Sequence, residues 1–299
     1  MKNYIALIFK GIGMGAANVI PGVSGGTIAL ITGIFEPLIE SIKSFNLQAL
    51  KLLFKGKFKE FAQHINLKFL VLVFLGIGIA IVSIAKLFDY LFDNYPIYIW
   101  AFFFGLVLAS VYFVAKTITK WNMSTIISFV VGTAIALIIS FLKPASEDSS
   151  LWYLIICGAV AACSMILPGL SGSFVLILMG NYQLVMINAV NEHKLNILLP
   201  VVAGAGVGLV VFSNILSWIF KKFHNQTIAV LSGFIFGSLS ILWPWKNPIT
   251  ETYGQKIKTI GYEWLLPTIN VEFIIAFVLI VLGILSIWLT EKYANKLAK

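Results

Sequence analysis

Two short segments of the chain carry the same run of proline, glycine and serine. Residues 20–26 read Ile-Pro-Gly-Val-Ser-Gly-Gly, and residues 167–173 read Leu-Pro-Gly-Leu-Ser-Gly-Ser. Proline removes a backbone donor and breaks a helix, whereas glycine allows positive φ and close approach to a ligand. The hydroxyl groups beside each break add further donors. This chemistry is typical of a site that binds an anion through uncharged hydrogen-bond donors.

A helix that starts directly after such a break directs its free N–H groups and the positive end of its dipole into the break. We therefore predict that both loops contribute to one phosphate site. The alternative is that glycine and serine only let neighbouring helices pack closely. The predicted site residues are Asn18, Gly22, Ser24, Gly25, Gly26 and Thr27 in the first loop, and Gly169, Ser171, Gly172 and Ser173 in the second.

The elements that must position these loops are membrane helices. Hydrophobic residues make up 60% of the 299 residues and charged residues 11%, against about 25% charged residues in a soluble domain. The apolar residues gather in blocks of about 20, the length that a helix needs to cross a bilayer. The composition therefore predicts an all-α membrane protein. The clear blocks are 69–92, 97–115, 123–142, 198–220, 227–244 and 271–290.

The chain also repeats itself beyond the two loops, where Gly33 aligns with Gly180 at the same offset. Gly76-Ile-Gly78 followed by Ser83 is similar to Gly206-Val-Gly208 followed by Ser213, and the run 102–105 is similar to 234–237. Two similar blocks in the same order indicate a duplication. We predict a first repeat at 1–145 and a second at 146–299, joined by the polar segment 143–150. The two repeats together form one membrane domain.

Each repeat opens with a segment that is interrupted by the proline-glycine loop, at 4–42 and 151–190. Such a segment either enters and leaves the bilayer on one side or counts as a single crossing. Treating both as re-entrant hairpins, with a cytoplasmic N-terminus, places nearly every lysine-rich loop in the cytoplasm, as the positive-inside rule requires. The loop 245–270, with three lysines outside, is the exception.

This charge distribution favours six transmembrane helices plus two re-entrant helical hairpins. Three crossings in each half would invert the second half relative to the first, so that the two halves form inverted repeats. The protein is then a multi-pass protein of the plasma (inner) membrane with both termini in the cytoplasm. All 21 basic residues are lysine, and their position in short loops fits this topology better than a nucleic-acid-binding face. No nucleic acid is therefore expected as a partner.

Acidic residues at membrane depth are candidates for function. Glu36, which follows the first break, is the candidate carrier of a coupling proton or cation; the alternative places Glu36 and Glu40 near the interface, where they are hydrated. Lys86 and Asp89 have the spacing of a helical ion pair. Lys86 would then extend toward the interface or meet an anionic headgroup.

The remaining reactive side chains argue against a metal or cofactor. Cys157 and Cys163 lie in an apolar segment and are expected to be free thiols rather than a disulfide. No zinc-ligand spacing exists. The three histidines, expected to be solvated at the surface, are His64, His193 and His224.

Three stretches of the chain resemble a known family: Gly15-Ala-Ala-Asn-Val-Ile-Pro-Gly-Val-Ser-Gly-Gly-Thr27, Gly33-Ile-Phe-Glu36 and Ile166-Leu-Pro-Gly-Leu-Ser-Gly-Ser173. It is the bacterial and archaeal family first catalogued as domain of unknown function 368, which is associated with polyprenyl-phosphate translocases of the PopT type. The resemblance covers nearly the whole chain. An acidic residue is common in the family where this chain has Asn18, so the resemblance assigns no coupling role to that position.

The resemblance implies a flippase that recycles undecaprenyl phosphate, the lipid carrier of cell-wall precursors, from the outer to the inner leaflet among the other membrane lipids. A carrier or channel for small soluble anions could use the same loops. A membrane enzyme acting on lipid phosphates fits less well, because the chain has no arginine and no histidine is expected at membrane depth. We therefore expect a transporter rather than an enzyme.

Overall fold

The computed structural model describes residues 2–19, 25–142, 144–253 and 256–297. Two predicted site residues, Gly22 and Ser24, lie outside these ranges. The side chains of Asn18, Lys86 and Asp89 are likewise outside the described part.

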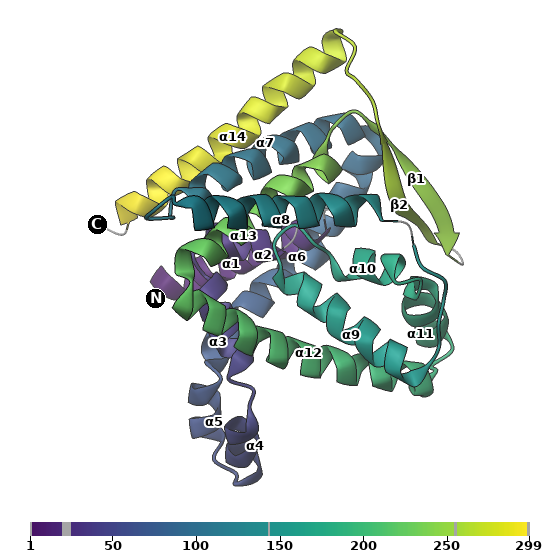
Figure 1. Cartoon of the computed structure of the whole chain (residues 1–299). Helices are drawn as coiled ribbons and strands as arrows, with labels where there is room; N and C mark the ends of the chain where they lie inside the picture. The colour runs from purple at the N-terminus through teal and green to yellow at the C-terminus, as the bar shows by residue number, and fades with distance from the viewer. Residues whose placement is uncertain (1, 20–24, 143, 254–255, 298–299) are drawn as a thin grey trace. The chain divides into compact units, whose positions relative to one another are not determined.

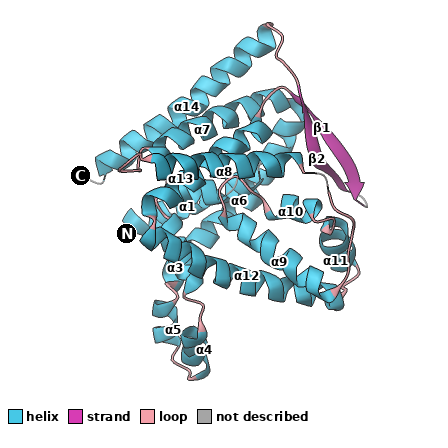
Figure 2. Cartoon of the chain, viewed as in Figure 1, coloured by secondary structure: helices cyan, strands magenta, loops and turns pink. Residues whose placement is uncertain are grey.

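The described chain is mostly helical (Figures 1 and 2). The helices of residues 2–142 are α1 (Lys2–Val19), α2 (Gly25–Ile31), α3 (Phe35–Lys43), α4 (Leu47–Phe54), α5 (Phe58–His64), α6 (Leu67–Asn94), α7 (Pro96–Ala115) and α8 (Met123–Phe141). The elements that follow are α9 (Leu151–Ile166), α10 (Gly172–Leu178), the π-helical turn η1 (Leu184–Asn188), α11 (Ala189–Asn191), α12 (Leu195–Lys222), α13 (His224–Leu242), β1 (Lys246–Tyr253), β2 (Lys256–Trp264) and α14 (Val271–Leu297).

Each predicted apolar block coincides with a long helix, namely α6, α7, α8, α12, α13 or α14. Among the described residues, five helices are long and apolar enough to cross a membrane, and there are up to seven spans if each of two bent helix pairs counts as one. The prediction of a multi-pass, mainly helical membrane protein is therefore confirmed at this level.

The prediction of an all-α protein was wrong for the loop 245–270, which contains the two-stranded sheet of β1 and β2 (Figure 2). Strand β2 is rich in isoleucine, threonine and aromatic residues, which favour strands. At the base of this hairpin, Lys246 donates to the carbonyl of Ile241. Its ammonium group also lies 3.6 Å from the ring centre of Trp100 and 4.2 Å from that of Tyr262.

The second arm of each predicted hairpin is not one helix. In the first, α2 ends after seven residues and the chain bends by 118° before α3. Gly33 at this bend has φ 71°, and Gly180 at the matching place after α10 has φ 73°. Both conformations favour glycine because a side chain would be strained there. The sequence alignment of Gly33 with Gly180 therefore corresponds to the same backbone turn.

The chain divides into two compact units, and each takes parts from both predicted halves. One unit contains residues 1–85, 143–224 and 252–258, and the other contains 86–142, 225–251 and 259–299. The units therefore do not follow the predicted boundary at residue 145, and the division into repeats stays a prediction.

In the first unit, α1 packs on α6 and α9 packs on α12 through glycines that touch the backbone of the partner helix. A side chain at any of these glycines would overlap a carbonyl oxygen, so the helices approach as closely as two backbones can. Gly78 and Gly206, which lie two residues further along, face open space instead. The contacts pair Gly11 with Val73, Gly76 with Ile8, Gly158 with Val201, and Gly204 with Ile155.

The second unit uses the same device between α7 and α14 and between α8 and α13. Its contacts pair Gly105 with Ile280, Gly283 with Phe102, Gly132 with Val230, and Gly233 with Phe129. By their packing contacts, Gly76 therefore corresponds to Gly204 and Gly105 to Gly233, with the same separation along the chain in both pairs. The sequence comparison instead aligned Gly76 with Gly206 and Gly105 with Gly237. The sequence comparison chose a different register because it could not show which glycine faces a partner helix.

Candidate functional site

The second proline-glycine loop interrupts the helical structure between α9 and α10. Leu167 at the end of α9 is extended, Gly169 has φ 82°, and α10 starts at Gly172. A side chain at Gly172 would meet the carbonyl oxygen of Ala161 at 2.8 Å, so glycine lets α10 start directly against α9. The predicted break around Pro168 is thus present.

The serines of this loop cap α10. Ser171 is the N-cap residue, and its Oγ accepts a hydrogen bond from the backbone N–H of Phe174 at 3.2 Å. The hydroxyls of Ser171 and Ser173 lie 3.0 Å apart and share a further hydrogen bond. Ser173 is exposed, whereas Gly169 and Gly172 are buried.

The backbone of the loop offers further donors. Among the residues that the structure describes, the N–H groups of Gly169 and Ser171 have no hydrogen-bond acceptor. A backbone N–H group without an intramolecular acceptor can donate to a bound anion. These N–H groups and the hydroxyls of Ser171 and Ser173 are the uncharged donors of the second loop.

The first loop is described only from Gly25 onward. Gly25, Gly26 and Thr27 form the first turn of α2, and all three are buried. Helix α2 packs against α9 within the first unit, so the two hairpins are neighbours there.

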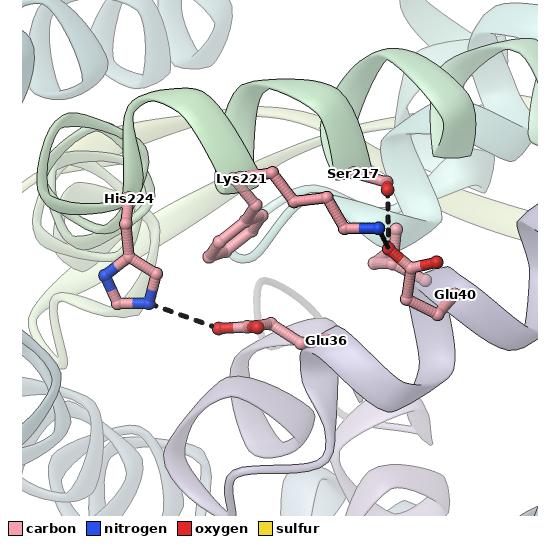
Figure 3. A pocket seen from close by; sticks show the side chains of 7 residues that line it. Glu36, Glu40, Ser217, Lys221 and His224 are labelled. Carbon is pink, nitrogen blue, oxygen red and sulfur yellow. Dashed lines mark hydrogen bonds and ion pairs between the residues drawn. The ribbon is translucent and has the colours of Figure 1, made fainter.

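A separate pocket of about 210 Å³ lies between α3 and the C-terminal end of α12. Figure 3 shows its polar side chains: Glu36 and Glu40 project from α3 toward Ser217, Lys221 and His224. Ile39 and Phe220 form its apolar wall. Acids from the first predicted half thus face bases from the second.

Glu40 is the centre of the stronger network in this pocket. It accepts a hydrogen bond from the buried Ser217 hydroxyl at 2.5 Å and pairs with Lys221 at 3.0 Å. Lys43 donates to the Ser217 hydroxyl at 2.9 Å and lies 3.8 Å from Glu40. These contacts fasten α3 to α12.

Glu36, the predicted coupling residue, lies 3.3 Å from Nε2 of His224. Both side chains are more than half exposed. His224 is at the surface, as expected. Sequence reasoning missed the contact, as well as the roles of Ser217 and Lys221, because nothing local links residues so far apart in the chain.

The prediction for the two cysteines is confirmed. Cys157 and Cys163 are both free thiols. Within the described residues, no group of three or more histidine, cysteine, aspartate or glutamate side chains could hold a metal ion.

Known proteins resemble this chain over most of its length. The sequence model of the VCA0040-like family, described as undecaprenyl phosphate translocase-like, matches residues 14–260. A polyprenyl-phosphate transporter of Vibrio cholerae serotype O1 is 38% identical over 307 residues, which cover 98% of each chain. A polyprenyl-phosphate transporter of Staphylococcus aureus is 30% identical over 254 residues, covering 79% of this chain and 85% of the relative.

No solved structure matches the chain. The family match covers both proline-glycine loops, the α3–α12 pocket and most of the long apolar helices. The chain therefore belongs to the VCA0040-like, undecaprenyl phosphate translocase-like family of membrane transporters.

Proposed function

We propose that this chain moves polyprenyl phosphate, such as undecaprenyl phosphate, from the outer to the inner leaflet of the plasma membrane. The observation that carries this proposal is its similarity, over 98% of both chains, to a protein named polyprenyl-phosphate transporter. The break between α9 and α10 supports it physically, because irregular backbone in a bilayer is tolerated where it lines protein or a watery cavity.

The proposed architecture has six spans and two re-entrant hairpins in inverted repeats, with both termini in the cytoplasm. The matched glycine contacts support the duplication. In the first unit α1–α6 corresponds to α9–α12, and in the second α7–α14 corresponds to α13–α8. Inverted repeats are common in transporters that alternate access around a site near the bilayer midplane.

The proposed headgroup site consists of the two proline-glycine loops. An unpaired phosphate in hydrocarbon would be very costly, and uncharged donors at the break offset part of that cost. In the second loop the donors are the N–H groups of Gly169 and Ser171 and the hydroxyls of Ser171 and Ser173. The first loop would add Asn18, Ser24 and Thr27, with Gly22, Gly25, Gly26 and Gly172 permitting close approach. The prenyl chain stays in the surrounding lipid.

Inward movement of an anion is opposed by a negative-inside membrane potential, at about 2.3 kcal/mol per charge per 100 mV. A proton or cation that moves with the phosphate would cancel this cost. Glu36 is the proposed carrier, and Nε2 of His224 lies 3.3 Å from its carboxylate.

The headgroup site is tested by removing hydroxyls. Cells whose recycling depends on this chain would carry Ser171→Ala with Ser173→Ala, and in a second strain Ser24→Ala with Ser171→Ala. Undecaprenyl phosphate exposed at the cell surface is then measured. We expect it to accumulate several-fold in both strains at unchanged protein level.

The matched control is Ser83→Ala with Ser286→Ala, which also removes two hydroxyls, each bonded to a carbonyl of its own helix. It should leave recycling unchanged. Normal recycling in both test strains would refute the loop site. Uptake of labelled inorganic phosphate by the purified protein in vesicles, without lipid movement, would instead favour the carrier of small anions.

A further inference from the structure

The segment between α3 and α6 folds into a pair of short helices, α4 and α5, that projects from the rest of the first unit (Figure 1). We name residues 44–68 the lysine hairpin. Its apolar side chains face outward: Leu47 is 78% exposed, Phe54 82% and Phe58 66%. Leu47, Leu50 and Phe54 lie on one face of α4, at i, i+3 and i+7. Soluble proteins rarely expose such an apolar stripe, and one that is exposed marks a surface that contacts a partner or a membrane.

Lysines alternate with these apolar side chains. The lysine hairpin has five lysines and one glutamate, Glu60, so its net charge is +4. Glu60 pairs with Lys57 at 2.8 Å. Within the described residues, Lys51, Lys55 and Lys59 have no acidic partner. The surface thus combines exposed apolar groups with unneutralised positive charge.

The angle of α5 suits a position along a membrane surface. Helix α5 and the apolar part of α6 are bent by 67° relative to each other. If α6 crosses the bilayer, α5 runs closer to the membrane plane than to its normal. An amphipathic helix with lysines beside phenylalanine and leucine binds in this interfacial layer.

A groove of about 590 Å³ lies at the junction of α5 and α6. Lys59 and Lys68 provide its charged groups, whereas Leu67, Val71 and Leu72 provide apolar wall. The Lys68 ammonium group is further held 3.8 Å from the ring centre of Tyr4 on α1. The groove therefore combines two lysine side chains with apolar side chains from the first residues of α6.

We propose that the lysine hairpin lies in the membrane interface and that its groove binds the headgroup of an anionic phospholipid. The phosphodiester would lie between Lys59 and Lys68, and one acyl chain would follow Val71 and Leu72. An acidic protein partner would pair with the lysines but would leave the apolar stripe of α4 without a matching environment. A lipid interface satisfies both, and the inference is independent of which substrate is transported.

The test is lipid retention by the full-length protein. Protein purified from mixed micelles containing equal amounts of phosphatidylglycerol and phosphatidylcholine would be analysed by native mass spectrometry. We expect retained phosphatidylglycerol in the wild type and a several-fold loss in Lys59→Gln with Lys68→Gln. The matched control, Lys116→Gln with Lys120→Gln, removes two other exposed lysines and should retain the lipid.

Equal retention by the wild type and the Lys59/Lys68 variant would overturn the proposal, as would an equal loss in the control, which would indicate a general charge effect. Equal retention of phosphatidylcholine would overturn the headgroup preference. An added arm offers undecaprenyl phosphate in place of phosphatidylglycerol, and selective retention of that lipid would overturn the assignment to phospholipid. The thermal unfolding temperature of each variant checks that it is folded.

Discussion

Glu40 has two kinds of partner, and the structure predicts which one holds α3 on α12. The Ser217 residue is 2% exposed and its hydroxyl lies 2.5 Å from the carboxylate. The Lys221 side chain is 67% exposed and lies 3.0 Å away. A hydrogen bond to a charged group contributes about 1.5–3 kcal/mol, whereas an exposed ion pair contributes about 0.2–1 kcal/mol.

Because the Glu40 side chain is itself 44% exposed, the lower part of each range applies. We expect a coupling energy of about 1.5 kcal/mol between Glu40 and Ser217, and of at most about 0.5 kcal/mol between Glu40 and Lys221. The hydroxyl should therefore stabilise the contact more than the formal ion pair, although Figure 3 shows both partners meeting the same carboxylate.

The assay is a pair of double-mutant cycles on unfolding by SDS in mixed micelles. The variants are Glu40→Gln, Ser217→Ala, Lys221→Gln and the two doubles that contain Glu40→Gln. The cycle cancels the separate loss of the bond from Lys43 to Ser217. The exposed pair Lys194–Glu192, at 2.8 Å, serves as a control and should show a coupling near zero that falls further with salt. A Lys221 coupling larger than the Ser217 coupling would refute the reasoning.

Three further predictions concern packing, a buried amide and a buried amine. Gly204→Ala should lower the free energy of unfolding by about 1–3 kcal/mol, because its methyl group would overlap the facing backbone. Gly206→Ala should be neutral or stabilising by up to about 1 kcal/mol, because Gly206 faces open space. Equal effects of the two variants in thermal unfolding would contradict the assigned contacts. Asn181 is fully buried, and its side chain forms hydrogen bonds with the backbone N–H and C=O of Asp148. Asn181→Ala should therefore lower the free energy of unfolding by about 2–3 kcal/mol. In the control Asn214→Ala, the lost amide bonds only its own helix, and the free energy of unfolding should fall by less than about 0.5 kcal/mol. Burial lowers the pKa of Lys246 from 10.5 to about 6; folding then expels a proton between these pH values, and stability should rise with pH across that window and be independent of it below pH 6. Lys246→Met should remove this part of the pH dependence, and an unchanged slope would contradict the shift.

Burial is the cause of the lowered pKa of Lys246, because the ammonium group loses its hydration and its charged form is disfavoured. The rings of Trp100 and Tyr262 act in the opposite direction, since a cation–π contact favours the charged form. Burial is the larger of the two effects.

The long helices could be predicted because a membrane span is a local property of about 20 apolar residues. The same holds for the break at Pro168, which proline and glycine encode directly. The additional turns at Gly33 and Gly180 were predictable in principle, because the two glycines align in the repeat. They were missed because a glycine in an apolar run is equally compatible with a continuous membrane helix.

Other features depend on contacts that the sequence does not show. The segment 245–270 is predicted as an external loop, because a two-stranded sheet needs only short runs of strand-favouring residues, which are hard to distinguish from a loop. The contact between Glu36 and His224 joins residues 188 positions apart. The register of the repeat could not be chosen without knowing that Gly76 touches a neighbouring helix while Gly78 does not.

In the proposed headgroup site, the donors of the second loop are all electrically neutral, being backbone amides and two hydroxyls. A site built from dipoles holds an anion in a shallow energy well, because it lacks the strong attraction of a guanidinium fork or a metal. For a carrier, shallow binding has a kinetic benefit: cargo that is captured weakly also leaves quickly, and turnover is not limited by escape. Introducing an arginine beside Ser173 would deepen the well and should slow release more than it improves capture.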